Sequence, residues 1–197
     1  MINLEQRQDF ILIRECECLM RFSSITKIIP SIFTLANLLF GFLALFFVLE
    51  GDYTLAAVCI LFSVLMDSLD GKVARRLSAS SEFGKELDSL SDLVSFGVAP
   101  ALLTYQVAFH SLQPEYMKYA GLAVAAIFVL CGAVRLARFN TLNITTHFVG
   151  VPITFAGGAM ALLILLRGEL VWFFYLVVML VLAGLMVSRF KVAKPGK

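Results

Sequence analysis

Residues 67–92 decide the fold, and they read Asp67-Ser-Leu-Asp70-Gly71-Lys-Val-Ala74-Arg75, then eight residues, then Gly84-Lys-Glu-Leu-Asp88-Ser-Leu-Ser-Asp92. Four aspartates lie here in an otherwise apolar chain, at spacings of three, eighteen and four residues. At about 100° per residue, Asp67, Asp70 and Gly71 share one face of a helix. Asp88 and Asp92 share a face of the next segment. We therefore expect two acidic helix faces, joined by a short turn, that point at each other.

Four carboxylates this close together repel one another unless a cation lies between them. Their hard oxygen atoms suit Mg²⁺ or Mn²⁺. Two such ions, about 4 Å apart, can hold diphosphate oxygens and neutralise the charge that develops during displacement at phosphorus. The alternative is that the aspartates cap helices or line a solvated loop. We expect a metal-assisted reaction at phosphorus.

The composition indicates an integral membrane protein. Of its 197 residues, 60% are hydrophobic and 15% are charged, whereas a typical soluble domain has about 25% charged residues. Ionisable groups at membrane depth are costly and are therefore candidates for function. The predicted fold class is all-α, a polytopic protein with six transmembrane helices, each long enough for a hydrocarbon core of about 30 Å. The expected spans are residues 28–49, 53–77, 82–107, 119–139, 149–166 and 170–188.

The basic residues predict the orientation. Fourteen of the sixteen lysines and arginines lie on one side of the six-span arrangement, and Lys118 and Arg167 lie on the other. The positive-inside rule then places both termini and the acidic site at the cytoplasmic face of the cell membrane.

Three parts are expected along the chain. Residues 1–28 form an N-terminal juxtamembrane segment, residues 29–188 form the six-helix domain, and residues 189–197 form a basic cytoplasmic tail. The first segment either forms a helix on the membrane surface or is dispensable, since Met20 is also a plausible start.

The pattern D-x2-D-G-x2-A-R-x8-G-x3-D-x3-D resembles the signature of the CDP-alcohol phosphatidyltransferase family, and the chain meets it at every fixed position. The resemblance implies an enzyme that transfers the lipid-linked phosphate of a CDP-lipid, usually CDP-diacylglycerol, to an alcohol and releases CMP. It implies that Asp67, Asp70 and Asp88 bind divalent metals. It also implies that Asp92 both touches a metal and takes the proton from the attacking hydroxyl. Family members are typically homodimers.

The same resemblance implies a set of residues that bind the CDP-lipid. Gly71 and Ala74 would let the cytidine moiety pack against the helix, and Arg75 would pair with the diphosphate. Ser78 or Ser81 would hydrogen-bond the nucleotide.

The first span contains a further stretch that resembles this family. It reads Pro30-Ser-Ile-Phe-Thr34-Leu-Ala-Asn37 and resembles P-x3-T-x2-N. Thr34 or Asn37 would thus reach the nucleotide. Alternatively, these two side chains make only interhelical hydrogen bonds.

The end of the fourth span bears on the acceptor alcohol. It reads Cys131-Gly-Ala-Val-Arg135-Leu-Ala-Arg138-Phe139-Asn140, which resembles G-x2-R-L-x-[RK]-F-N of the membrane-embedded phosphatidylserine synthases of bacteria and archaea. Arg135 and Arg138 would bind the carboxylate of serine, or else serve as basic anchors at the membrane face. Downstream, Phe148-Val-Gly150-Val-Pro152-Ile-Thr154 resembles F-x-G-x-P-x-P, but Thr154 stands where a second proline is usual.

The expected activity is therefore transfer of the phosphatidyl group from CDP-diacylglycerol to L-serine by single displacement. No covalent nucleophile is evident beside the aspartates. One alternative is another acceptor, glycerol 3-phosphate or inositol phosphate, although no further basic cluster is present to bind its phosphate. The other is a divalent-cation carrier, although such sites usually lie at the midplane between repeats. The expected partners are the two substrates, the bilayer and a second copy of the chain, with no nucleic acid.

Overall fold

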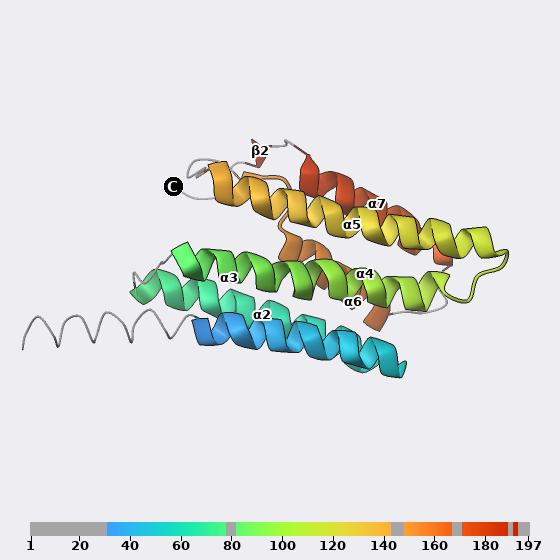
Figure 1. Cartoon of the computed structure of the whole chain (residues 1–197), viewed down its shortest axis with the longest axis horizontal. Coiled ribbons are helices and arrows are strands. Elements are labelled where there is room, and N and C mark those ends of the chain that lie inside the picture. The colour runs from blue at the N-terminus through green and yellow to red at the C-terminus, as the bar shows by residue number, and fades with distance from the viewer. Residues whose placement is uncertain (1–30, 78–81, 143–147, 167–170, 189–190, 193–197) are drawn as a thin grey trace, which may run out of the picture.

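The computed structural model describes residues 31–77, 82–142, 148–166, 171–188 and 191–192. Long helices run side by side along one axis of the molecule (Figure 1). The first described helix is Ser31–Glu50. The elements that follow are α2 (Tyr53–Leu77), α3 (Glu82–Asp92), the π-helix η1 (Leu93–Val98), α4 (Ala99–Thr104), the π-helix η2 (Tyr105–Phe109), α5 (Glu115–Leu142), β1 (Phe148–Val149), α6 (Ile153–Leu165), α7 (Trp172–Val187) and β2 (Lys191–Val192). The predicted all-α class is confirmed, with one two-residue strand pair added.

A tight turn joins the first helix to α2, where the sequence predicts one. Gly51 has a φ of +80°, a left-handed conformation that glycine adopts at little cost. The backbone N–H of Asp52 donates to the carbonyl of Phe47 (2.9 Å). The Asp52 carboxylate accepts from the backbone N–H of Leu55 (2.9 Å) and so caps the start of α2.

The elements α3, η1, α4 and η2 form one helical rod, Glu82–Phe109. The sequence predicts a span here but not its π-helical parts. The backbone N–H of Ala99 donates to the carbonyl of Val94, five residues earlier. Pro100 follows and has no N–H to continue the normal helical pattern. The widened turn therefore lies immediately before the proline, within the segment that follows the aspartates.

The helices pack closely where glycines face a neighbour. Helix α6 packs against α2, η1 and α4, and α5 packs against α7. A Cβ atom on Gly157 of α6 would lie 2.6 Å from the backbone oxygen of Phe96 in η1. A Cβ atom on Gly158 would lie 3.2 Å from Val64 of α2. These contacts fix α6 against the two elements that flank the acidic site.

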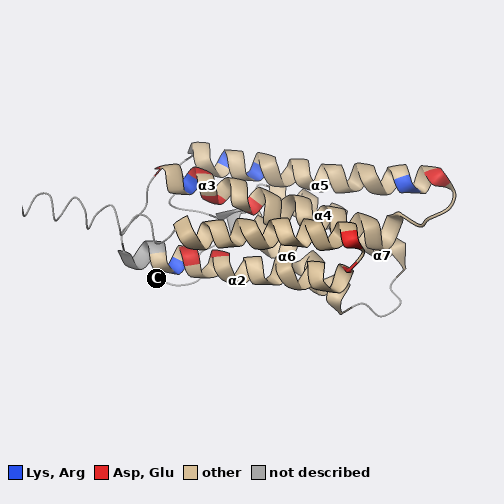
Figure 2. Ribbon diagram, turned by 60° about the horizontal axis from the view of Figure 1, so that its bottom comes forward, with Lys and Arg blue, Asp and Glu red and all other residues tan. Residues whose placement is uncertain are grey.

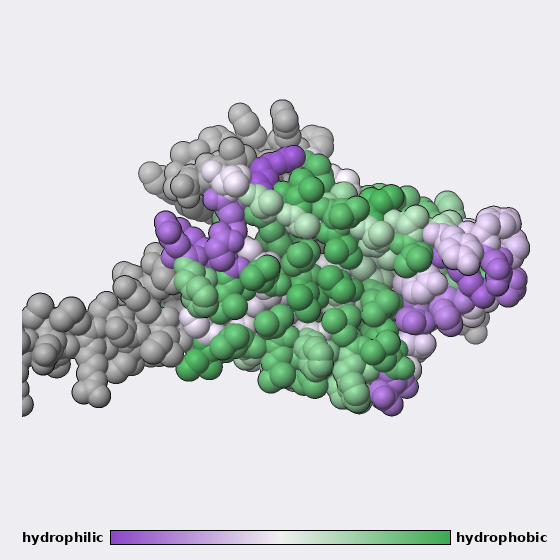
Figure 3. Space-filling model, in the orientation of Figure 1, coloured by the Kyte–Doolittle hydropathy of each residue, from purple (hydrophilic) through white to green (hydrophobic). Residues whose placement is uncertain are grey.

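Four of the described helices are long and apolar enough to cross a membrane, and together with the apolar surface they mark a membrane protein. They are Ser31–Glu50, Tyr53–Val73, Glu82–Phe109 and Glu115–Thr141. Charged residues gather toward the ends of the helices (Figure 2). Hydrophobic side chains cover the middle of the face seen in Figure 3. The expected number of six spans and the orientation of the termini stay predictions.

Helices α6 and α7 are shorter than the fifth and sixth predicted spans. They have 13 and 16 residues, whereas a crossing takes roughly 20. Before α6, Phe148 and Val149 pair antiparallel with Val192 and Lys191. Gly150 then adopts a φ of +76°. The predicted fifth helix thus begins four residues late, at Ile153, because the chain before it is extended and then turns.

Candidate functional site

Three of the four predicted aspartates meet between α2 and α3. Oxygen atoms of Asp67, Asp88 and Asp92 all lie within 4.8 Å of one another. Asp92 is buried, and the other two are half-buried. The two acidic faces therefore do approach each other, as the spacing of the residues predicts.

Asp70 lies outside this three-carboxylate group within the described part of the chain. It follows Asp67 by three residues, which turns it by about 60° from Asp67 around the axis of α2. Its side chain is buried and accepts a hydrogen bond from the hydroxyl of Thr34 in the first helix. Asp70 thus faces the first helix.

Asn37 of the first helix contacts the acidic group directly. Its amide nitrogen donates to the carboxylate of Asp92 (3.2 Å). Its side-chain oxygen is buried and has no hydrogen-bond partner among the described residues. Thr34 and Asn37 therefore make the interhelical hydrogen bonds that were one of their two expected roles. Their contact with a nucleotide stays a prediction.

Three serines fix the first helix at this level. The hydroxyls of Ser63 in α2 and Ser95 in η1 both donate to the backbone carbonyl of Asn37, at 3.2 and 3.0 Å. The hydroxyl of Ser91 donates to the backbone carbonyl of Thr34 (3.2 Å). These serines are fully buried, so their hydroxyls hydrogen-bond to backbone carbonyls and not to water. The hydrogen bonds from these three serines hold Thr34 and Asn37 beside the aspartates.

The other predicted CDP-lipid residues lie at or beyond the end of α2. Gly71 is exposed, one residue after Asp70. Ala74 and Arg75 belong to α2, but their side chains lie outside the described part. Ser78 and Ser81 lie outside the described residues altogether.

The two predicted acceptor residues on α5 differ in their surroundings. Arg135 lies close enough to Asp92 for their charges to interact. Its Nε atom is buried and has no hydrogen-bond partner among the described residues. Arg138 instead donates from Nη1 to the backbone carbonyl of Val187 at the end of α7 (3.3 Å). The structure thus brings Arg135, but not Arg138, toward the acidic group.

Thr154, where the related stretch usually has a proline, is half-buried near the start of α6. Sequence reasoning missed the contacts of Asn140 near the site. Asn140 of α5 donates to Ser89 of α3 (3.0 Å) and to Glu86 (3.3 Å). The signal available in the sequence was the place of Asn140 at the end of the arginine motif.

The described residues fit a hard divalent cation. Asp67, Asp88 and Asp92 offer carboxylate oxygens, which Mg²⁺ and Mn²⁺ prefer. Like charges this close and this buried are costly without a cation between them. The buried amide oxygen of Asn37, with no described partner, adds a free oxygen on a residue that contacts Asp92.

A sequence model of the CDP-alcohol phosphatidyltransferase family matches residues 27–188. The chain belongs to this family. The match spans all four aspartates, both arginines and Thr154, so the acidic site lies within the family's domain.

Three relatives carry the name CDP-diacylglycerol–serine O-phosphatidyltransferase. The protein of Helicobacter pylori strain J99 is 38% identical over 143 residues, 71% of this chain and 58% of that protein. The protein of Bacillus subtilis strain 168 is 38% identical over 136 residues, 68% of this chain and 74% of that protein. The protein of Methanocaldococcus jannaschii is 46% identical over 132 residues, 66% of this chain and 58% of that protein. The chain therefore spans less than two thirds of the first and third relatives.

Proposed function

We propose that the protein transfers the phosphatidyl group of CDP-diacylglycerol to the hydroxyl of L-serine, giving phosphatidylserine and CMP. The observation that carries the proposal is the group of Asp67, Asp88 and Asp92 with Arg135 beside it. The names of the relatives support serine as the acceptor. The proposed role is a step of phospholipid biosynthesis in the cell membrane.

Asp67, Asp88 and Asp92 would hold Mg²⁺ or Mn²⁺, with Asp70 as the fourth proposed ligand of a two-ion site. Bound cations would neutralise the diphosphate oxygens and the charge that develops on the departing phosphate of CMP. The donor set supports this assignment because it consists of carboxylate oxygens in a buried setting.

The CDP-lipid would lie along the end of α2. Gly71 and Ala74 would leave room for the cytidine moiety, and Arg75 would pair with the diphosphate. Ser78 or Ser81 would hydrogen-bond the nucleotide. Thr34 and Asn37 would contact the nucleotide from the first helix. The amide oxygen of Asn37 has no partner among the described residues.

The acceptor would enter between Arg135 and Asp92. Arg135 would hold the carboxylate of serine, with Arg138 as the second proposed contact, and Asp92 would take the proton from the serine hydroxyl. The serine oxygen then forms a bond to the lipid-linked phosphorus as the bond from that phosphorus to the CMP oxygen breaks. Phosphatidylserine and CMP leave, and Asp92 returns its proton to solvent. One displacement completes the transfer.

The membrane arrangement follows the same proposal. Six spans would place both termini and the aspartates at the cytoplasmic face of the cell membrane, and the protein would act as a homodimer. CDP-diacylglycerol would reach the site from the bilayer and serine from the cytosol.

The test is release of CMP by the purified full-length protein in detergent with CDP-diacylglycerol and Mg²⁺ or Mn²⁺. L-Serine, glycerol 3-phosphate and inositol phosphate are supplied in parallel. We expect turnover with serine alone and its loss with EDTA. In Asp92→Asn, kcat should fall about 10²–10⁴-fold because the general base is lost. Glu50→Gln makes the same chemical change at an exposed residue of the first helix and should keep the wild-type rate.

Three outcomes would contradict the proposal. Turnover with a phosphorylated alcohol would replace serine as the acceptor and overturn the role of Arg135. No CMP release with any acceptor would favour a cation carrier. Exchange of labelled CMP into CDP-diacylglycerol without serine would show a phosphatidyl-enzyme intermediate and rule out the single displacement.

A further inference from the structure

Asn37 of the first helix is a fully buried amide whose two ends have different surroundings. Its Nδ2 atom donates to the carboxylate of Asp92 (3.2 Å), and its Oδ1 atom has no hydrogen-bond partner among the described residues. An ionised carboxylate can only accept a hydrogen bond, so the NH₂ end of the amide must face Asp92. A buried polar atom without a partner lowers the stability of a fold. An asparagine here therefore carries a cost that an apolar residue would avoid.

The packing of the first helix at this level does not depend on the side chain of Asn37. The backbone carbonyl of Asn37 accepts hydrogen bonds from the hydroxyls of Ser63 and Ser95. One turn later, a Cβ atom on Gly41 would lie 2.9 Å from the Cα atom of Ser95, so the two backbones are in close contact. The first helix is thus held against α2 and η1 through its backbone. The side-chain hydrogen bond to Asp92 is additional to this packing.

The same contacts fix Asn37 relative to Asp92. Ser95 lies three residues after Asp92 in the same helical rod, so its hydrogen bond to the carbonyl of Asn37 joins the two backbones beside the acidic group. With both backbones fixed, the amide N–H determines how the carboxylate is rotated. It occupies Oδ1 of Asp92 and leaves Oδ2 for a cation or for the proton of an attacking hydroxyl. Asp92 is buried, so little water is present to orient it instead.

We propose that Asn37 is a positioning residue that orients the carboxylate of Asp92 for proton transfer and for metal binding. This inference rests on the proposed function, in which Asp92 is both the general base and a metal ligand. The NH₂ end of Asn37 acts only through Asp92. The Oδ1 end stays available for the nucleotide contact proposed above, so the two roles belong to opposite ends of one amide.

The first test is the variant Asn37→Leu, which keeps the approximate shape of the side chain and removes both polar ends. In purified full-length protein, kcat for CMP release with CDP-diacylglycerol and L-serine should fall about 10- to 100-fold, the usual effect of losing such an orienting contact. The affinity for Mn²⁺ without substrate, measured by electron paramagnetic resonance of free Mn²⁺, should fall about tenfold. KM for serine should stay within about threefold, because the lost interaction serves the transition state and not the binding of serine.

A second variant, Asn37→Ser, tests the same contact if leucine disturbs folding. The serine hydroxyl is too short to reach Asp92 and can donate to the backbone carbonyl one turn earlier instead. This variant should lose kcat and Mn²⁺ affinity to a similar degree.

The background of Asp92→Asn tests whether Asn37 acts through Asp92. With the base already removed, its orientation no longer matters, so adding Asn37→Leu should lower kcat by less than about twofold more. A general loss of packing would lower kcat by the same factor in both backgrounds.

Thr104→Val is the control for destabilisation. Thr104 is a fully buried threonine of α4, in the same rod as Asp92, and its hydroxyl donates to the backbone carbonyl of Pro100 (2.7 Å). Its loss should lower the thermal midpoint and leave kcat and Mn²⁺ affinity unchanged, because the group lies away from the aspartates.

Three results would overturn the inference. Wild-type kcat and Mn²⁺ affinity in both Asn37 variants, with a raised KM for CDP-diacylglycerol, would make Asn37 a nucleotide contact only. An equal loss of kcat with and without Asp92→Asn would show that Asn37 does not act through Asp92. No CMP release and no Mn²⁺ binding by the wild-type protein would instead overturn the proposed function, and the role of Asn37 with it.

Discussion

Arg135 and Arg138 lie about one turn apart on α5, but their guanidinium groups have different surroundings. A buried guanidinium needs partners for its N–H groups, and the Nε of Arg135 has none among the described residues. Arg138 already donates to the carbonyl of Val187, which ties α5 to the end of α7. Arg135 also lies near Asp92, the proposed proton acceptor. We infer that carboxylate recognition rests mainly on Arg135, and that Arg138, the second proposed contact, contributes less because it also ties α5 to α7.

The kinetics of arginine variants should separate these roles. Arg135→Gln should raise KM for serine about 10- to 100-fold, since a hydrogen bond to a charged group contributes about 1.5–3 kcal/mol. Arg138→Gln, the matched change one turn away, should alter KM for serine less than threefold and lower the thermal midpoint. CMP release at saturating CDP-diacylglycerol, with serine varied, measures both. Equal increases in KM would show that the two arginines contribute equally to binding serine, contrary to the main role inferred for Arg135.

The acidic group was largely predictable from the sequence, but the contacts around it were not. Asp88 and Asp92 share a helix face by spacing alone, and the short connection to α2 brings Asp67 to them. Nothing in that spacing reveals that Asp70 turns toward Thr34, because the first helix could have packed on either side of α2. The hydrogen bond from Asn37 to Asp92 joins residues 55 positions apart in the sequence. Such contacts depend on tertiary packing, which no local pattern specifies.

The contact between η1 and α6 connects the helix packing to the site. Gly157 of α6 faces the backbone of Phe96 in η1, and Thr154 lies one turn earlier on the same helix. Without a Cβ, the two backbones approach more closely than side chains would allow. The π-helical turn of η1 begins directly after Asp92. A shift of Gly157 against Phe96 would therefore also displace the backbone next to a proposed metal ligand.

Gly157→Ala should therefore destabilise the protein. The new Cβ would lie 2.6 Å from the Cα and the backbone oxygen of Phe96, so a backbone must move, and overpacking of this kind costs about 1–3 kcal/mol. We expect a thermal midpoint several degrees lower in detergent, with reduced CMP release. Gly184→Ala on α7 is the control, because no described atom lies within 4 Å of its added Cβ. A midpoint for Gly157→Ala equal to that of the control would show that the contact is not tight.

At the scale of elements, the sequence predicts the helices better than their irregularities. The second predicted span, residues 53–77, matches α2, and Gly51 forms the predicted turn before it. The third span is present as a helical rod, but the sequence does not predict its two π-helical parts. The fifth span begins late because Val149 pairs with β2. A two-residue strand pair between residues 148–149 and 191–192 leaves no periodic signal.

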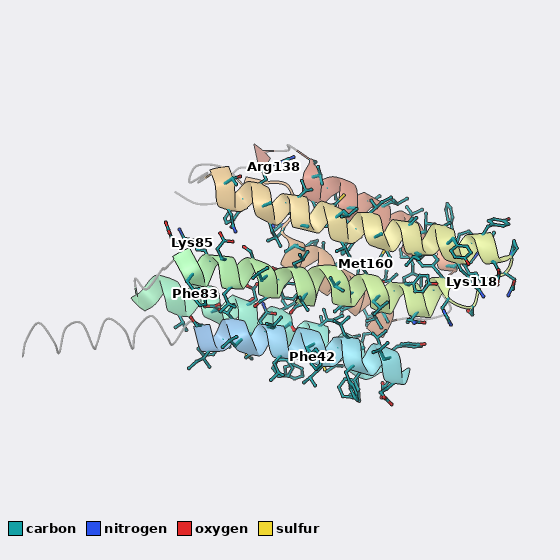
Figure 4. The ribbon with its side chains drawn as sticks, in the orientation of Figure 1. Phe42, Phe83, Lys85, Lys118, Arg138 and Met160 are labelled. Atoms are coloured by element: carbon teal, nitrogen blue, oxygen red, sulfur yellow. The ribbon has the colours of Figure 1, made fainter. Side chains whose placement is uncertain are left out.

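The charges of the whole molecule are distributed in a way that fits a protein spanning a bilayer. Lys85 and Arg138 lie toward one end, and Lys118 lies at the opposite end (Figure 4). Large hydrophobic side chains are exposed on the outer faces of the helices between them, among them Phe42, Phe46 and Phe62 of the first two helices. Burial of these faces in lipid removes the free-energy cost of exposing apolar surface to water. The open question at this scale is whether α6 and α7 cross the whole bilayer.

Single cysteines labelled with a membrane-impermeant maleimide can answer it. In a variant with the four native cysteines replaced by serine, Glu115→Cys should react in intact bacterial host cells, and Lys85→Cys only in inverted membrane vesicles. Both wild-type residues are exposed, at the two ends of the molecule.

Leu166→Cys, at the exposed end of α6, should react like Glu115→Cys if α6 spans the membrane. At 13 residues α6 is about 20 Å long, so a crossing requires that the bilayer thin around it or that residues outside the helix complete the span. Reaction of Leu166→Cys only in inverted vesicles would show instead that α6 and α7 form a hairpin that enters and leaves by the cytoplasmic face. The molecule would then have four spans, with the aspartates still at the same face as Lys85.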